Sequence, residues 1–238
     1  MKIAIIGYGR MGKTIEKLAP EYQSSIHLAI DTEAEAEQYA DQLKEADVAI
    51  EFSQPEVAFD NIVRCLNWGI PVVSGTTGWL DRMEEVRAIC EQQKGAFFYA
   101  SNFSIGVNIF FAVNRYLAQM MDQYPQYQID LEEIHHTGKV DAPSGTAISL
   151  AKDILAAVER KANWVKEKEE KAEDLAIRSV REAHVPGTHE VFYSSPIDQL
   201  SIKHIAHSRE GFARGALQAA KWLVGKQGCF GMRDLLGI

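Results

Sequence analysis

Three glycines near the N-terminus constrain the fold of this chain more than any other feature. Gly7, Gly9 and Gly12 follow the apolar run KIAII and open the helical pattern MGKTIEKLA, in the spacing G-x-G-x-x-G. In that position they allow a tight turn, a close approach of backbone to a pyrophosphate, and tight packing of helix on strand. The helix N-terminus then offers free amides to the phosphates. We therefore predict a dinucleotide-binding unit here; a glycine-rich structural turn is the alternative.

The next hundred residues extend this unit into an open sheet. Short apolar runs alternate with helical patterns; the strands are IHLAI, DVAIEF, PVVSG and AFFYA, and the helices are EAEAEQYADQLK, PEVAFDNIVRCLNWG and LDRMEEVRAICEQQKG. Continuous apolar strands joined by crossover helices are typical of a parallel sheet that is covered on both faces. The predicted fold class is α/β, with a doubly wound, Rossmann-like parallel sheet.

The pattern changes at Ser101, where a long apolar helix begins in SNFSIGVNIFFAVNRYLAQMMDQY. Beyond it we predict a strand in QIDLEEIHH, a helix in GTAISLAKDILAAVERKA, and three antiparallel strands in LAIRSVREAHV, THEVFYSS and QLSIKHIAHS. The charge-dense stretch RKANWVKEKEEKAED is predicted to be a solvated helix end or loop. Strands and helices are segregated here, so the second domain is expected to be α+β on a mixed or antiparallel sheet.

The chain closes with an amphipathic helix, GFARGALQAAKWLVG, and a short tail. Because this helix follows the second domain, it can return to cover the first sheet, which makes the first domain discontinuous. We predict a dinucleotide-binding domain of residues 1–103 plus 207–238 and a second domain of residues 104–206.

Composition restricts the class of partner. The 238 residues include 33 acidic and 25 basic side chains, for a formal net charge of −8, and 46% are hydrophobic. Such a chain is not suited to nucleic acid or an anionic membrane surface, although a local basic pocket for a small anion is compatible with it. Cys65, Cys90 and Cys229 share no metal or redox spacing, so we expect reduced thiols and a cytoplasmic protein. We expect neither a signal peptide nor a bilayer span, which needs about 20 apolar residues.

An acidic residue ends the second predicted strand. Asp31 stands near the offset at which a carboxylate accepts hydrogen bonds from the adenosine ribose, which favours NAD and repels the 2′-phosphate of NADP. Arg10 and Lys13 flank the phosphate loop and could neutralise that phosphate. The residues therefore leave both cofactors open and favour NADH; an exposed loop position is the alternative for Asp31.

Two further loops follow the third and fourth strands, at the edge where ligands bind in open α/β sheets. Phe52 begins one of them, and Gly75, Thr76 and Thr77 form the other. The second loop offers unhindered backbone and two hydroxyls, which suit a nicotinamide carboxamide or a ribose. Glycine and threonine are also ordinary turn residues, so each loop by itself is a weak indication.

The segment EEIHHTGKVDAPSGTA, which begins at Glu132, gathers ionisable side chains just before a helix. Neighbouring side chains on a strand face opposite sides, so His135 and His136 point in different directions unless the strand has ended. An imidazole, with an ordinary pKa near ~6.5, suits proton donation at neutral pH. After a turn at Gly138, Lys139 adds a compact, strongly hydrated cation.

The step from Pro143 into the helix completes a receptor for a carboxylate. Ser144 suits the N-cap, and the amides around Gly145 and Thr146 then point outward as donors. Two other readings are less favoured. A metal site of the two histidines with Asp141 lacks the H-x-x-x-H type of spacing, and a nucleophilic Ser144 lacks the G-x-S-x-G elbow. We predict no metal.

The same segment resembles the signature of the 4-hydroxy-tetrahydrodipicolinate reductase family, also called dihydrodipicolinate reductase. The resemblance spans nearly the whole chain through GYGRMG, DVAIEFSQPE, VSGTTGW, ASNFSIGVN, HSREGFARGALQAAKWL and GMRDLL. It implies an NADH- or NADPH-dependent reductase of lysine and diaminopimelate biosynthesis that transfers hydride to a cyclic unsaturated dicarboxylate. It further implies that the second domain binds this substrate and assembles the chain into a homotetramer.

The resemblance also implies roles for individual residues. His135 is the expected proton donor, Lys139 is the cation that orients and polarises the substrate, and His136, Gly145 and Thr146 hold its carboxylates. Glu132, Glu133 and Asp141 are expected to be structural. Many family members carry a basic residue directly after the acidic ribose ligand, where Thr32 stands here, which disfavours NADPH. The expected cofactor contacts are Gly7, Tyr8, Gly9, Arg10, Met11, Gly12, Asp31, Phe52, Gly75, Thr76, Thr77, Ala100, Ser101, Asn102 and Phe103.

Overall fold

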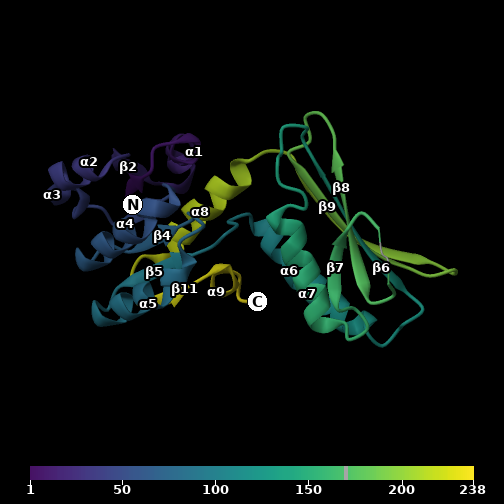
Figure 1. Cartoon of the computed structure of the whole chain (residues 1–238). Helices are drawn as coiled ribbons and strands as arrows, with labels where there is room; N and C mark the ends of the chain where they lie inside the picture. The colour runs from purple at the N-terminus through teal and green to yellow at the C-terminus, as the bar shows by residue number, and fades with distance from the viewer. Residues whose placement is uncertain (169–170) are drawn as a thin grey trace. The chain divides into compact units, whose positions relative to one another are not determined.

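The computed structural model describes residues 1–168 and 171–238. Two compact units make up this part of the chain (Figure 1). One unit contains Met1–Ile105 together with Glu210–Ile238, and the other contains Gly106–Arg209. The chain thus leaves the first unit and returns to it.

The first unit is built on a six-stranded sheet in the order β11-β5-β4-β3-β1-β2. Every pair of neighbouring strands in it is parallel, which confirms the predicted doubly wound α/β fold class. The strands are β1 (Lys2–Ile6), β2 (Ser25–Ile30), β3 (Val48–Glu51), β4 (Val72–Ser74), β5 (Ala96–Tyr99) and β11 (Gly228–Phe230).

Helices cover both faces of this sheet. They are α1 (Arg10–Leu18), α2 (Glu33–Gln38), α3 (Ala40–Leu43), α4 (Pro55–Asn67), α5 (Met83–Gln92), α8 (Glu210–Leu223) and α9 (Met232–Leu236), with 3-10 turns at Ala19–Tyr22 and Leu80–Arg82. Successive side chains of β1 pack into different hydrophobic cores. Ile3 and Ile5 pack with α1 and α8, on one face of the sheet. Ala4 and Ile6 pack with α4 and α5, on the other face. Both faces of the strand are therefore buried, which explains the continuous apolar runs.

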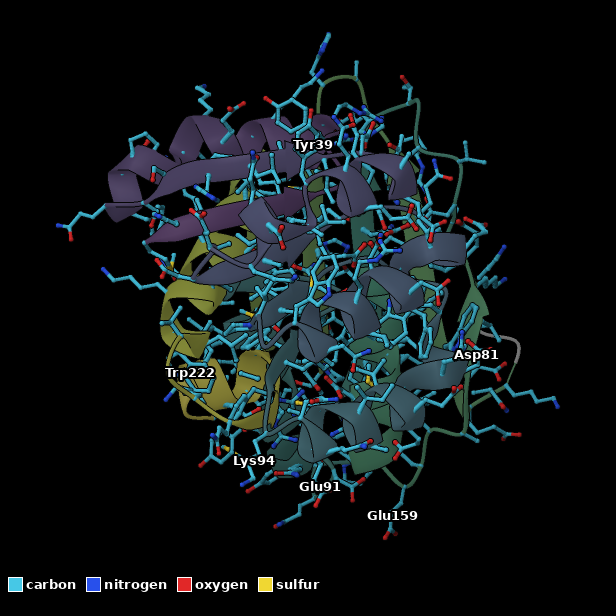
Figure 2. The ribbon with its side chains drawn as sticks, turned by 90° about the vertical axis from the view of Figure 1, so that its left-hand side faces the viewer. Tyr39, Asp81, Glu91, Lys94, Glu159 and Trp222 are labelled. Atoms are coloured by element: carbon cyan, nitrogen blue, oxygen red, sulfur yellow. The ribbon has the colours of Figure 1, made fainter. Side chains whose placement is uncertain are left out.

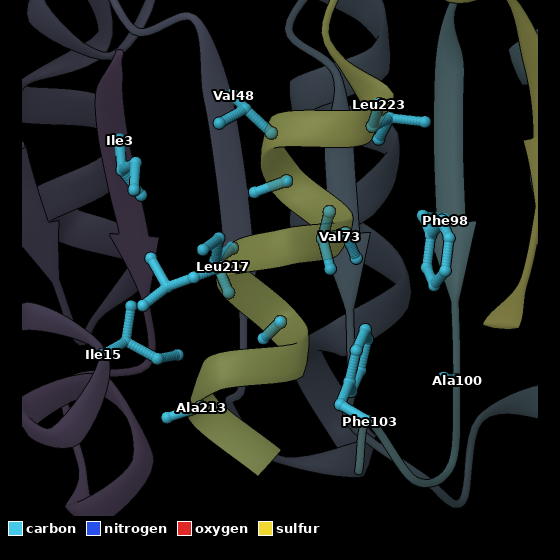
Figure 3. Close-up of a cluster of buried hydrophobic side chains, with 14 of the residues drawn as sticks. Ile3, Ile15, Val48, Val73, Phe98, Ala100, Phe103, Ala213, Leu217 and Leu223 are labelled. Carbon is cyan, nitrogen blue, oxygen red and sulfur yellow. The ribbon is translucent and has the colours of Figure 1, made fainter. Parts of the chain in front are cut away.

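The returning helix α8 closes one of these cores (Figure 3). Leu217 and Leu223 of this helix lie in one hydrophobic cluster with Val73 of β4, and both leucines are fully buried. Gly215 allows α8 to approach the backbone at Phe103 closely, because a Cβ atom at this position would lie 1.7 Å from the Phe103 carbonyl oxygen. The prediction that the terminal helix covers the first sheet is confirmed.

Charged side chains at the end of α5 face outward. Glu91 near the end of α5 and Lys94 just beyond it extend away from the ribbon (Figure 2).

Cys65 and Cys90 are buried and Cys229 is half-buried, and all three are free thiols, as expected. Burial raises the pKa of the Cys65 thiol to about 12, so this side chain acts as an apolar group.

The second unit contains a mixed five-stranded sheet in the order β10-β9-β6-β8-β7. The packed helices α6 (Ile105–Met121) and α7 (Gly145–Ala157) share a core with β6, β8 and β9. The mixed α+β class agrees with the prediction. The strands are β6 (Gln128–His135), β7 (Asn163–Lys166), β8 (Asp174–Arg181), β9 (Gly187–Ser194) and β10 (Gln199–Ala206).

Three local predictions were wrong. Strand β8 is parallel to β6, not antiparallel, because the connection between them passes through α7 as a crossover. Part of the charge-dense stretch forms the edge strand β7. The single helix predicted from EAEAEQYADQLK is divided at Tyr39 into α2 and α3. The tail after α8 contains the strand β11, which the sequence analysis did not predict.

Among the described residues, no helix is both long enough and apolar enough to span a membrane.

Candidate functional site

The glycine loop after β1 has the geometry of a phosphate-binding turn. Gly7 has a φ of +92°, and a Cβ atom there would lie 2.2 Å from the Phe52 carbonyl oxygen. A Cβ atom on Gly12 would lie 2.6 Å from the carbonyl oxygen of Gly7. Gly9 is different: it is the N-cap of α1, and no atom lies within 4 Å of the position that its Cβ would take. The space beside the free amides of α1 is therefore open, as a pyrophosphate requires.

A cavity of about 420 Å³ continues from this loop. Asp31 is part of its wall and also holds the loop, because its Oδ1 accepts a hydrogen bond of 2.9 Å from the Tyr8 amide. Arg64 of α4 lies in the same wall and forms an ion pair of 2.8 Å with Glu33, a contact that the sequence analysis missed. The lining residues are Ile6, Gly7, Gly9, Ile30, Asp31, Thr32, Glu33, Phe52, Ser53, Gln54, Val57, Asp60, Asn61 and Arg64. The volume lies in the range of small-molecule sites.

Hydrogen bonds hold the turn after β4. The Thr76 hydroxyl donates to Glu51 Oε1 at 2.7 Å and accepts from the Ser53 amide at 2.9 Å. This hydroxyl therefore braces the turn. Glu51 is fully buried and also accepts from Ser74 at 2.6 Å. Thr77 is exposed.

The remaining predicted cofactor contacts differ in exposure. Arg10 and Ser101 are exposed, and Met11 and Asn102 are half-buried. The side chains of Ala100 and Phe103 belong to the hydrophobic core, so any contact of these two with a ligand must come from their backbone. The Phe103 ring packs 5.7 Å from that of Phe52, measured between centroids.

In the second unit the two histidines occupy different environments. His135 is the last residue of β6 and is 8% exposed, whereas His136 follows the strand and is half-buried. The Nε2 atom of His136 lies 3.1 Å from an Nη atom of Arg209. This separation agrees with the expected alternation along the strand. Arg209 was not among the predicted site residues.

The centre of the polar cluster is Glu133, for which the sequence analysis expected only a structural role. Its side chain is fully buried, and the Ser144 amide donates to its two oxygens at 3.1 and 3.0 Å. The Ser179 hydroxyl donates to Oε1 at 2.9 Å, and Arg181 lies 3.4 Å from the same oxygen. Strand alternation contained the signal, because Glu133 and His135 stand two residues apart and so share one face of β6.

Two histidine rings lie against this carboxylate. His135 Nδ1 is 3.4 Å and His189 Nε2 is 3.7 Å from Glu133 Oε2, and the ring centroids are 5.0 Å apart. Burial by itself would raise the pKa of Glu133, but the hydrogen bonds from Ser144 and Ser179 and the nearby His135 lower it overall. Burial lowers the pKa of His189 to about 3, so this ring is neutral. Burial also lowers the pKa of His135, and the charge of Glu133 opposes that shift.

A metal could use donor atoms at this spacing, since those of Glu133, His135 and His189 lie within 4.8 Å of one another. However, N–H groups of Ser144 and Arg181 are already directed at the carboxylate. We therefore interpret the group as a hydrogen-bonded cluster.

Lys139 forms an ion pair with a residue of its own segment. Its Nζ atom contacts both carboxylate oxygens of Asp141, at 2.7 and 2.8 Å. Hydrogen bonding to this lysine holds the pKa of Asp141 below its ordinary value. Asp141 thus has a specific contact that the sequence analysis did not assign.

The start of α7 agrees with the prediction. Ser144 is the N-cap, and its hydroxyl accepts a hydrogen bond of 3.2 Å from the Ala147 amide. Ser144 is buried, which is unsuited to a nucleophile. Gly145 is exposed with open space beside it, and the amides of Gly145 and Thr146 stand in the first turn, where no intrahelical acceptor exists.

A Rossmann-like unit with a phosphate loop, followed by a unit with a buried imidazole, a lysine and an open helix N-terminus, defines a nicotinamide-nucleotide-dependent reductase. Family models agree with this class. The model described as "Dihydrodipicolinate reductase, N-terminus" matches residues 1–103, and the one described as "Dihydrodipicolinate reductase, C-terminus" matches residues 106–236. The chain belongs to the dihydrodipicolinate reductase family and is an NAD(P)H-dependent oxidoreductase of lysine and diaminopimelate biosynthesis.

Individual relatives agree with the family. The chain is 48% identical to the 4-hydroxy-tetrahydrodipicolinate reductase of Christiangramia forsetii over 99% of its own length and 98% of that protein. It is 33% identical to the protein of the same name from Methanoregula boonei, over 100% of its own length and 98% of that protein. Dihydrodipicolinate reductase from Paenisporosarcina sp. TG-14, solved with dipicolinate bound, has the same fold, with a TM-score of 0.80 at 20% identity and 98% coverage of both chains.

Proposed function

We propose that this chain reduces 4-hydroxy-tetrahydrodipicolinate to tetrahydrodipicolinate, with the first unit holding NADH or NADPH and the second unit holding the substrate. The observation that carries the residue assignment is the constellation of His135, Lys139 and the open first turn of α7 in one segment. It supplies a proton donor, a cation and amide donors, which are the groups that protonation and binding of a dicarboxylate require.

The first unit offers each part of the cofactor a partner. The open space over Gly9, at the N-terminus of α1, suits the pyrophosphate, with the backbone of Tyr8, Arg10 and Met11 around it. Asp31 suits the adenosine ribose, and the backbone of residues 75–77 and 100–103 suits the nicotinamide end. When bound, the reduced cofactor supplies the hydride.

Substrate carboxylates are the expected ligands of Lys139, His136 and the amides of Gly145 and Thr146. The ion pair with Asp141 keeps Lys139 in place before substrate arrives. A substrate carboxylate then exchanges with Asp141, whose side chain is 60% exposed and can move into water. Bound in this way, the lysine draws electron density from the ring that accepts the hydride.

His135 supplies the proton that accompanies the hydride. The 4-hydroxyl group leaves as water together with a ring hydrogen, which gives the unsaturated ring that accepts the hydride. The hydride brings an electron pair to this ring, and the proton from the imidazolium neutralises the charge that develops. The ring of His135 is then neutral and regains its proton from water once the product has left. Its burial keeps the proton transfer separate from bulk solvent.

NADH is the favoured cofactor. The 2′-phosphate of NADPH would approach Asp31 and Glu33, and the cation in that cavity wall, Arg64, is already paired with Glu33. Thr32, where many relatives carry a basic residue, caps α2 through its side chain. Comparison of kcat/KM for the two cofactors should give a value for NADH at least equal to that for NADPH. A strong preference for NADPH would show that Arg10, Lys13 or Arg64 outweighs the carboxylates.

The family resemblance supports a cytoplasmic homotetramer assembled through the second unit. Exposed apolar side chains on β10, Leu200 and Ile205, are compatible with a subunit contact there. Sedimentation analysis of the purified chain should give four times the chain mass, and a monomer would contradict the proposal.

A coupled assay tests the reaction. Condensation of pyruvate with aspartate semialdehyde generates the substrate, and consumption of NADH then depends on the purified chain. Turnover that requires both precursors supports the proposal. Binding of NADH without turnover would show that the substrate belongs to another class.

A further inference from the structure

Glu133 and His135 form a buried pair that the proposed mechanism does not yet use. Both side chains lie on one face of β6, and neither is more than 8% exposed. The Ser144 amide donates to both oxygens of Glu133 and the Ser179 hydroxyl donates to Oε1, so the position of the carboxylate is defined from two sides. The carboxylate is a fixed element beside the ring of the proton donor.

The two nitrogens of His135 face different surroundings. Nδ1 is buried, makes no hydrogen bond, and lies 3.4 Å from Glu133 Oε2. Nε2 lies on the opposite side of the ring, near Gly187. A Cβ atom at Gly187 would lie 3.1 Å from Nε2, so the absence of a side chain keeps that nitrogen clear. Hydrogen bonds of catalytic groups are often long before substrate binds and shorten in the complex.

The charges around the ring are opposed. Lys139 and Arg181 disfavour the imidazolium, whereas Glu133 and, less strongly, Asp141 favour it. The neighbouring ring of His189 is neutral. Of the charges facing His135, that of Glu133 stabilises its protonated form most.

We propose that Glu133 is a positioning residue for proton transfer: it accepts a hydrogen bond from Nδ1 of His135, leaves Nε2 as the nitrogen that gives up the proton, and stabilises the imidazolium until the hydride arrives. The same carboxylate holds the Ser144 amide, so it sets the position of the proton donor relative to the first turn of α7. The inference rests on the proposed role of His135.

The test is the pH dependence of kcat in the Glu133→Gln variant. This substitution keeps the shape of the side chain and removes its charge. We expect kcat to decline at high pH, where His135 loses its proton. Loss of the Glu133 charge should move the midpoint of this decline about one pH unit lower. On the alkaline side kcat should then be about tenfold lower, with an unchanged KM for NADH. Glu133→Asp, which restores the charge, should bring the decline back toward its original pH.

Ser179→Ala is the matched control. It removes a hydrogen bond from the same carboxylate but keeps the charge, and its pH profile should match that of the unmodified protein. A Glu133→Gln variant that loses activity equally at every pH would overturn the inference, because a structural role predicts that result. The His135→Ala variant separates the two hypotheses in that case. If it is inactive, only the proposed role of Glu133 is wrong. If it retains turnover, the proposed role of His135 is wrong as well.

A second measurement needs no variant. Nitrogen NMR of the unmodified protein, with labelled histidine, should show neutral His135 carrying its proton on Nδ1. A neutral ring protonated on Nε2 would overturn the inference even if Glu133→Gln does not fold.

Discussion

The glycine loop makes a prediction that separates folding from cofactor binding. Gly7 has a φ of +92°, a conformation that costs a residue with a Cβ atom about 1–2 kcal/mol. In addition, the Cβ atom of alanine would meet the Phe52 carbonyl oxygen at 2.2 Å, so the backbone must move. We expect Gly7→Ala to lower the free energy of unfolding by about 3 kcal/mol or more. For a chain of this size that corresponds to a melting temperature lower by roughly 6–12 °C.

Gly9→Ala should behave in the opposite way. Gly9 has a φ of −77°, which any residue adopts, and its Cβ position is empty. The stability cost should be that of an N-cap change from glycine to alanine, below about 1 kcal/mol. The added methyl group fills the space beside the α1 amides, so the Kd for NADH should rise at least about tenfold, or about 1.4 kcal/mol.

Thermal unfolding followed by circular dichroism measures the first effect, and titration of NADH by calorimetry measures the second. Both variants are measured without cofactor first, because a bound cofactor would itself stabilise the fold. The reasoning is refuted if Gly9→Ala binds NADH normally, or if it destabilises the fold as much as Gly7→Ala does.

Further predictions concern the second unit. His135→Ala and Lys139→Ala should each lower kcat by roughly 10²-fold while the Kd for NADH stays near its original value; steady-state kinetics on folded variants with near-normal turnover would contradict the assigned roles. Asp141→Asn removes the competitor of the substrate for Lys139, so KM for the substrate should fall. Since exposed ion pairs contribute about 1 kcal/mol at most, the decrease should not exceed about fivefold. Dialysis against a chelator should leave kcat unchanged, because hydrogen-bond donors already contact the Glu133 carboxylate. If chelation abolished the activity and zinc restored it, a metal site at Glu133, His135 and His189 would be favoured instead.

Much of the first unit could be predicted because its signals are local. The strand, the glycine spacing and the helix stand in one stretch of the chain, and they agree with one another. Ser144 could be placed at the N-cap for the same reason, since a cap depends on its own residue and the three that follow. In each case neighbours in sequence decide the structure.

Other features depend on contacts between distant segments. The direction of β8 follows from the crossover of the chain through α7. The segment β11 is a strand because it pairs with the edge strand β5. The Thr76 hydroxyl donates a hydrogen bond to Glu51 of another strand, a contact that the sequence analysis did not predict. Lys139 also pairs with Asp141, a contact that the sequence analysis did not predict, because a turn brings the two side chains together.

The sequence by itself determined the class of this protein: a phosphate-binding turn, a doubly wound sheet, and one segment with two histidines, a lysine and a helix N-terminus. These depend on residue types at short spacings, which backbone geometry converts directly into local structure. Only the tertiary structure decided the surroundings of Glu133. Its partners come from the N-cap of α7, from β8 and from β9, and folding brings them around one buried carboxylate; they are Ser144, Ser179, Arg181 and His189. A buried charge needs such partners, and no pattern along the chain states which ones it will meet.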